Sequence, residues 1–241
     1  MRLDRVGLKR NAKDIMRSHS PGVYLVALLL LAIFYVLEYL STRLAVPGLT
    51  QDVVRQLQRG VVTERVIRQI TETQPSFFSD LLNIAIWALT ILLTVGFSAF
   101  CLNISRGLEA GPGTLFDGFG NFLRLLWLNV LIGIFVFLWS LLFVIPGIVA
   151  AYRYSMAVYI MLDDPTRPAL DCIRESKAIT AGHKGELFAL DLSFLGWFIL
   201  SAIPFVSVYV MPYYRLTHVG AYQTLAAPPV DQSYRGPGFY Q

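Results

Sequence analysis

The stretch LLWLNVLIGIFVFLWSLLFVIPGIVAAYRYSMAVYIML, residues 125–162, decides the fold of this chain. It runs for 38 residues, and Arg153 is its only charge. As one α-helix it would be about 57 Å long, whereas the hydrocarbon core of a bilayer is about 30 Å thick. Proline removes a backbone donor, and glycine accepts the backbone angles of a tight reversal. We therefore predict a helical hairpin in a membrane, with its break at Pro146 and Gly147 and with Arg153 in its second arm.

The composition of the whole chain agrees with this prediction. Of its 241 residues, 55% are hydrophobic and only 15% are charged, and the mean hydropathy is +0.56. Soluble domains carry about 25% charged residues. The longest polar segment, 42–76, is too short for a typical soluble catalytic domain. The sequence therefore predicts an all-α fold, a polytopic transmembrane helix bundle of about six spans with short amphipathic surface helices.

The apolar runs define the domain organisation. The six predicted spans are residues 23–44, 78–103, 122–144, 148–162, 187–203 and 205–226. They form a membrane domain, 21–226, with an extracytoplasmic loop 45–76 and a cytoplasmic loop 163–186, between a basic cytoplasmic segment 1–20 and a disordered cytoplasmic tail 227–241. Lys and Arg are enriched in cytoplasmic loops, and this arrangement places 14 of them inside and five outside. We expect a multi-pass protein of the cell membrane with both termini in the cytoplasm.

Basic residues flank the apolar spans, which favours anionic lipid headgroups over nucleic acid as the partner. In residues 2–17 the basic side chains recur at spacings of three and four, so they share one face of a helix. A second surface helix is expected near 168–180. The predicted headgroup contacts are Arg2, Arg5, Lys9, Lys13, Arg17, Arg174, Lys177 and Lys184. A solvated basic face without a specific partner explains the N-terminal pattern equally well.

Two charges fall inside predicted spans, Arg153 and Asp191. A charge at the centre of a membrane helix costs about 2.5–3.5 kcal/mol, so such residues usually face the bundle and find a partner. Our preferred hypothesis is an Arg153–Asp191 ion pair that holds the fourth and fifth spans together. Pairing of Arg153 with Glu38, or extension of Arg153 toward an interface, remains open.

Other polar residues carry weaker predictions. Tyr152, Ser155 and Tyr159 share one helix face, where they either form interhelical hydrogen bonds or line a polar cavity. The three histidines and Asp163-Asp164 lack the spacing of a known metal site, and no catalytic constellation is present. Cys101 and Cys172 do not indicate a disulfide framework. We therefore predict no catalytic residue, no metal and no cofactor.

Several motifs of the second half occur together in a known order. The second half of the chain resembles the bacterial integral membrane protein family called domain of unknown function 975 (DUF975). The matching blocks cover about residues 115–222 and are FDGF at 116–119, LWSLLFVIPG at 138–147, YRYSM at 152–156, DDP at 163–165, IRESK at 173–177, GHK at 182–184, LDLSFLGW at 190–197 and PY at 212–213. The segment AIPF at 202–205 departs from the family's Gly-rich connection. The resemblance implies a membrane architecture and no established activity.

Three functions fit these observations. The favoured one is a non-enzymatic scaffold or subunit of a membrane complex that binds lipid, with a membrane protein or a second copy as a further partner. The first alternative is a small-solute or ion carrier or channel with a polar path near Arg153 and Asp191. The second alternative is a lipid-processing intramembrane enzyme that uses Asp163, Asp164 or His183. No convincing inverted repeat supports transport, and no acid–base constellation supports catalysis.

Overall fold

The computed structural model describes residues 3–45, 59–60, 63–64 and 77–227. The described part of the chain is all-helical, as predicted. Its elements are α1 (Arg5–Ser18), α2 (Gly22–Ala45), α5 (Phe77–Ser105), the 3-10 helix η1 (Pro112–Asn121), α6 (Phe122–Leu142), α7 (Val144–Tyr154), α8 (Ala157–Asp163), α9 (Ala169–Ile179), α10 (Lys184–Leu192), α11 (Leu195–Leu200) and α12 (Pro204–Ala226). Arg2, most of the expected outer loop 45–76 and nearly all of the expected tail 227–241 lie outside the described residues.

In the described part of the chain, four helices are long and apolar enough to cross a membrane: Gly22–Thr42, Phe77–Ser105, Phe122–Leu142 and Val144–Asp163. They match the first four predicted spans within a few residues. The predicted span 187–203 instead contains the end of α10 and all of α11, separated by two non-helical residues. The predicted span 205–226 corresponds to α12. Since these helices are long and apolar and many of their large apolar side chains are exposed, the chain is a membrane protein.

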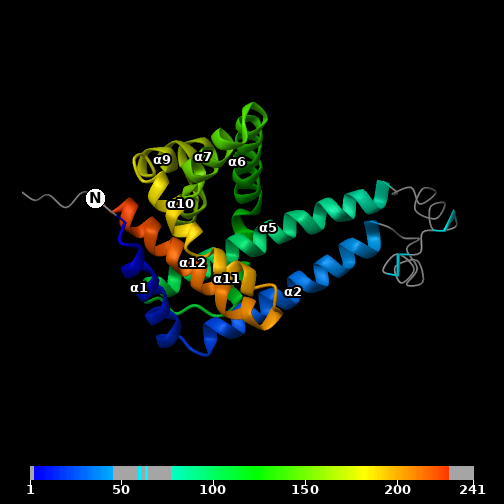
Figure 1. Ribbon diagram of the computed structural model, residues 1–241, viewed down its shortest axis with the longest axis horizontal. Helices are drawn as coiled ribbons and strands as arrows, with labels where there is room; N and C mark the ends of the chain where they lie inside the picture. Colours follow the sequence, from blue (N-terminus) through cyan, green and yellow to red (C-terminus); the bar gives the residue numbers. More distant parts are fainter. Residues whose placement is uncertain (1–2, 46–58, 61–62, 65–76, 228–241) are drawn as a thin grey trace, which may run out of the picture.

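Helices α2 and α5 form an extended pair that projects from the rest of the molecule (Figure 1). Both are apolar along most of their length, which favours long uninterrupted helices in lipid. The Ser41 hydroxyl donates a hydrogen bond to Asn83 Oδ1 at 2.9 Å and so links the two helices near their far ends. The opposite end of α5 packs against η1, α8 and α12 and carries the core.

The predicted hairpin forms, but its break lies three residues before Pro146. Phe143, with φ −161° and ψ 151°, is the one non-helical residue between α6 and α7. Pro146 is the third residue of α7, where its missing N–H belongs to the first turn and no hydrogen bond is lost. The tip is apolar and exposed, with Val144 at 71% and Ile145 at 75%.

Gly147 has a different role from the one predicted, because it is helical and does not adopt the positive φ seen at Gly182. It allows α6 and α7 to pack closely. A Cβ atom at Gly147 would lie 2.0 Å from the Ser140 Oγ and 2.9 Å from the Ser140 Cα. Such distances leave no room for any side chain, so the hairpin depends on glycine here.

The second arm of the hairpin is interrupted between α7 and α8, and a neighbouring helix supplies the missing hydrogen bonds. Ser176 of α9 donates its hydroxyl to the Arg153 carbonyl at 2.9 Å and accepts from the Met156 N–H at 3.2 Å. The Thr180 hydroxyl also lies 3.3 Å from the Arg153 carbonyl. Ser176 and Thr180 are fully buried. The helix expected near 168–180 is therefore α9, and one of its faces is packed against the bundle.

The N-terminal basic helix α1 packs on α12 (Figure 1). Ala12 and Met16 are buried in this contact. Lys9 donates to the Ser193 carbonyl at 3.1 Å and lies over the Phe194 ring, 4.2 Å from its centroid. Burial, followed by the charges of Lys13 and Arg5, lowers the pKa of Lys9. Lys9 therefore contacts the protein, and its role in headgroup binding stays a prediction.

Lys13 follows the same pattern, because its ammonium lies 5.4 Å from the centroid of the Tyr213 ring. Arg5 and Arg17 remain exposed on α1. On α9, Arg174 is exposed and forms an ion pair with Asp171 at 2.9 Å. For exposed positions such as these, the role as headgroup contacts stays a prediction.

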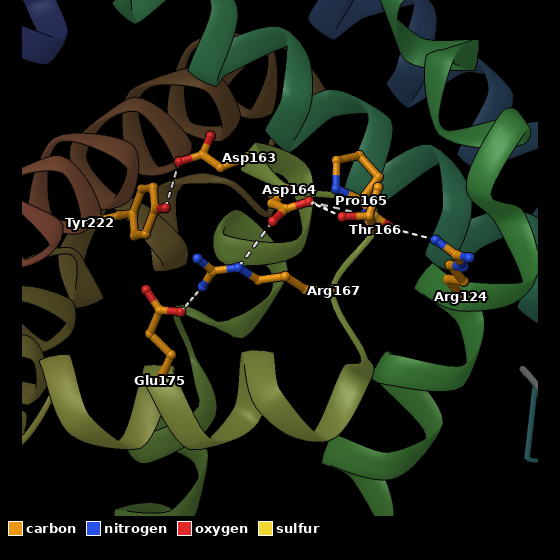
Figure 2. A network of polar contacts seen from close by, with 8 residues as sticks. All are labelled: Arg124, Asp163, Asp164, Pro165, Thr166, Arg167, Glu175 and Tyr222. Carbon is orange, nitrogen blue, oxygen red and sulfur yellow. Dashed lines mark hydrogen bonds and ion pairs between the residues drawn. The ribbon is translucent and has the colours of Figure 1, made fainter.

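One end of the bundle gathers the ends of several helices in a polar network (Figure 2). Asp163 pairs with Arg106 at 2.8 Å and accepts a hydrogen bond from the Tyr222 hydroxyl at 2.6 Å. Arg124 donates to the Pro165 carbonyl at 2.7 Å. The end of α5, the start of α6, the end of α8 and the end of α12 therefore lie on the same side of the bundle, as the predicted alternation of spans requires.

Next to this network, Asp164 and Arg167 form a loop structure that precedes α9 (Figure 2). The Thr166 hydroxyl and backbone N–H both donate to Asp164 Oδ1, and these hydrogen bonds hold the pKa of Asp164 below its usual value. Arg167 pairs with Glu175 of α9 and with Asp164, and both carboxylates raise the pKa of Arg167. The polar residues after α8 are thus engaged with one another.

Replacement of Gly147 by alanine tests the close packing of α6 and α7. We expect Gly147→Ala to destabilise the protein by about 1–3 kcal/mol, because the new methyl group overlaps Ser140. Gly133→Ala on α6 is the matched control, since no atom lies within 4 Å of a Cβ there. The apparent Tm of each variant in detergent measures the difference. Equal Tm values for the two variants would show that α6 and α7 are not this close.

Candidate functional site

A polar cavity of about 570 Å³ lies between α5, α6, α7–α8, α10 and α12. We call it the polar cavity. Its polar lining includes Asn129, Tyr152, Tyr159, Asp191, Arg215 and His218. Tyr152, Ser155 and Tyr159 all line it, which confirms that they share a face, and Tyr152 also makes an interhelical hydrogen bond. These residues belong to helices that are otherwise largely apolar, so the cavity is the candidate functional site.

Asp191 joins three helices within the cavity. The Tyr152 hydroxyl of α7 donates to Asp191 Oδ2 at 2.8 Å. His218 Nε2 of α12 lies 2.7 Å from Asp191 Oδ1. Tyr214, also on α12, lines the cavity beside them. Both oxygens of Asp191 are therefore occupied by protein donors, and the carboxylate holds α7, α10 and α12 together.

Arg153 is not the partner of Asp191. Among the described residues no ion pair joins the two side chains, and the Arg153 Nε is buried without a hydrogen-bond partner. The reason is geometric, because consecutive residues of a helix point about 100° apart. Tyr152 faces α10, so its neighbour Arg153 points away from Asp191. The predicted contact between α7 and α10 forms, but Tyr152 makes it.

Arg215 is the cation of the cavity. It is half-buried on α12 and lines the cavity together with Tyr159. Within the described part of the chain no carboxylate lies within ion-pair distance of Arg215. Asp191 lines the same cavity, but its carboxylate oxygens are engaged by Tyr152 and His218. The guanidinium therefore retains donors that no acidic side chain accepts.

A second, mostly apolar hollow of about 800 Å³ lies between α2, α5 and the start of α12. We call it the apolar groove. Its apolar lining includes Leu28, Ala32, Phe34, Ile86, Phe205 and Val208. Trp87 and Thr90 of α5 line both the apolar groove and the polar cavity, so the two hollows adjoin. An apolar space beside a polar one is the shape that an amphipathic molecule fills.

Sequence reasoning missed two of the central residues. Arg215 is one of the 14 cationic residues that the sequence assigns to the cytoplasm, and His218 is one of the three histidines for which it predicts no site. A usable signal was present in the predicted span 205–226: Pro204 opens the helix, so Arg215 comes three turns inside it. Tyr214 and His218 are four residues apart and thus share a face.

The residues that an intramembrane enzyme would use, Asp163, Asp164 and His183, are engaged with other side chains. Asp163 and Asp164 belong to the network at the end of the bundle, and His183 Nδ1 lies 2.8 Å from Glu186 Oε2. No group of three His, Cys, Asp or Glu side chains in the described ranges could hold a metal ion. Cys101 and Cys172 are buried as free thiols.

Residues 141–228 match the model of the family described as Protein of unknown function (DUF975). The match confirms the predicted resemblance. We refer to these residues as the DUF975 segment. The segment includes the second arm of the hairpin and all helices from α9 onward, and it contributes every ionisable lining residue of the polar cavity: Tyr152, Tyr159, Asp191, Tyr214, Arg215 and His218. No curated protein and no solved structure matches the chain.

Double-mutant cycles separate the two candidate partners of Asp191. We expect Tyr152→Phe and Asp191→Asn to be coupled by about 0.5–1.5 kcal/mol, because each removes one side of the same hydrogen bond. Arg153→Gln and Asp191→Asn should be additive within about 0.5 kcal/mol. Unfolding free energies in mixed micelles provide the measurement. A larger coupling for Arg153 than for Tyr152 would restore the original ion-pair hypothesis.

Proposed function

We propose that this chain is a non-enzymatic membrane protein that binds a membrane lipid between its helices and serves as a scaffold or subunit of a membrane complex. The single observation that carries the proposal is the apolar groove of about 800 Å³ beside the polar cavity. Lipids present the same pairing of an apolar chain and a polar headgroup. A family description that specifies no activity leaves this geometry as the main guide.

The proposal includes six spans in the cell membrane, with both termini in the cytoplasm. The fifth span would be α10 with α11, whose 17 positions from Lys184 to Leu200 measure about 25 Å as helix. The sixth would be α12. The network around Asp163 supports this order, since it joins helix ends that alternate topology places on one side. The excess of Lys and Arg on that side supports its assignment to the cytoplasm.

Anionic lipid is the partner that the charges favour. The chain has a formal net charge of +4, and several cations such as Arg5, Arg17 and Arg174 are exposed. Cytoplasmic leaflets are rich in anionic headgroups. As a scaffold, the chain would also bind a membrane protein or a second copy of itself. The exposed apolar helices provide a surface for such a partner in the membrane.

Blocking the apolar groove tests lipid binding directly. Ala32 is exposed and lines the groove, so Ala32→Trp places a large ring where an acyl chain would lie. Ala85→Trp is the matched control, because Ala85 is exposed on α5 and does not line the groove. After reconstitution with phosphatidylglycerol and phosphatidylcholine and return to detergent, native mass spectrometry counts the retained phospholipids.

We expect the wild type and Ala85→Trp to retain a phospholipid and Ala32→Trp to lose it at unchanged apparent Tm. The physical reason is steric, since an indole ring fills space that the chain needs. Retention by Ala32→Trp, or no retention by any variant, would contradict the proposal.

A second candidate function, a small-solute carrier, is favoured by the polar cavity and its Asp191–His218 pair. Buried ionisable residues in membrane helices often mark a solute or proton path. Uptake of inorganic phosphate into proteoliposomes distinguishes the two functions. Uptake by the wild type that is lost in Asp191→Asn supports a carrier, whereas equal flux with protein-free liposomes supports the scaffold.

A further inference from the structure

We propose that the polar cavity is a phosphate-binding site in which Arg215 is the receptor. This inference deepens the proposed function. For a lipid ligand it rests on that function, because the phosphate of the headgroup would bind Arg215 while an acyl chain occupies the apolar groove. A guanidinium presents a planar set of donors that matches the oxygens of a phosphate in pairs. A cavity with such a group, half-buried and without an acidic partner among the described residues, is suited to an anion.

The surroundings of Arg215 support an anion rather than a cation as the ligand. Asp191, the carboxylate among the described residues that line the cavity, accepts a hydrogen bond from Tyr152 and lies 2.7 Å from His218 Nε2. A ligand cation would have to share this carboxylate with both side chains, whereas no acidic side chain of the described residues competes with an anion for Arg215. Tyr159 lines the same cavity and carries a hydroxyl group. Asn129 adds an amide to the lining, although its Nδ2 donates to the Leu125 carbonyl at 2.9 Å.

The two hollows follow one another along α12 in the order of a lipid headgroup and its chains. On α12, Phe205 and Val208 line the apolar groove, and Tyr214, Arg215 and His218 line the polar cavity. Ten residues of helix separate Phe205 from Arg215, which is about 15 Å along the axis. With the end of α12 on the cytoplasmic side, the cavity lies nearer the cytoplasm than the groove. A lipid of the inner leaflet has its headgroup and its chains in this order.

Three ligands distinguish binding at the phosphate site from binding in the apolar groove. Phosphatidylglycerol offers both a phosphate and acyl chains, diacylglycerol offers the chains alone, and inorganic phosphate offers the anion alone. The full chain is titrated with each lipid in detergent by native mass spectrometry and with inorganic phosphate by calorimetry. The variants are Arg215→Gln and Arg215→Lys. Arg10→Gln is the control, because Arg10 is exposed on α1 and lines neither hollow.

We expect Arg215→Gln to weaken phosphatidylglycerol binding by about tenfold or more and to leave diacylglycerol binding unchanged. Arg215→Lys should show a smaller loss, because the charge remains and the paired donors do not. Arg10→Gln should bind all ligands as the wild type does. Apparent Tm values confirm that each variant is folded.

The outcomes separate the two proposals. Equal binding of phosphatidylglycerol and diacylglycerol, unaffected by Arg215→Gln, would overturn the phosphate site and leave the lipid-binding groove in place. Binding of neither lipid would contradict the proposed function. In that case, binding of inorganic phosphate that depends on Arg215 would support the site with a free anion as its ligand, and no phosphate binding would overturn the site as well.

Discussion

Backbone hydrogen bonding is the constraint on which this structure depends, since hydrocarbon offers no water to an unpaired N–H or C=O group. The hairpin between α6 and α7 meets this constraint with a turn of one residue: the Phe143 N–H donates to the Trp139 carbonyl, and the Gly147 N–H donates to the Phe143 carbonyl. So short a turn adds no unpaired backbone group to those that the two helix ends leave. It requires two helices in close contact, which Gly147 permits.

The same constraint explains why the second arm can be broken. Between α7 and α8 the helix is interrupted, and Ser176 accepts from one side of the gap and donates to the other. Irregular backbone at membrane depth is tolerated where protein covers it or where it lines a cavity. Both conditions apply here, since α9 covers the break and Ser155 lines the polar cavity. The interruption between α7 and α8 therefore forms part of the lining of the polar cavity.

Hydropathy predicted the fold better than it predicted the site. Long apolar runs bounded by Pro, Gly or charge, such as the one that forms α5, have few alternatives to a membrane helix. The sequence predicts the break of the hairpin at Pro146 because proline usually ends a helix. Proline is equally compatible with the first turn of a helix, and that is its position in α7. The partners of Asp191 depend on how α7, α10 and α12 pack, and spacing within one helix contains no such information.

Counting Lys and Arg to assign orientation does not detect an arginine that lines a cavity inside the membrane. Counting Lys and Arg assigns orientation well when the charges lie in loops. Arg215 lies within α12, so counting it as a loop charge removed it from the search for intramembrane polar groups. Arg153, which the sequence search selected, has its backbone carbonyl bound to α9 and its Nε buried without a partner, outside the cavity lining. An ionisable residue inside a membrane helix therefore becomes informative only once its neighbours on other helices are known, and here those neighbours assign Asp191 to the packing of helices and Arg215 to the cavity.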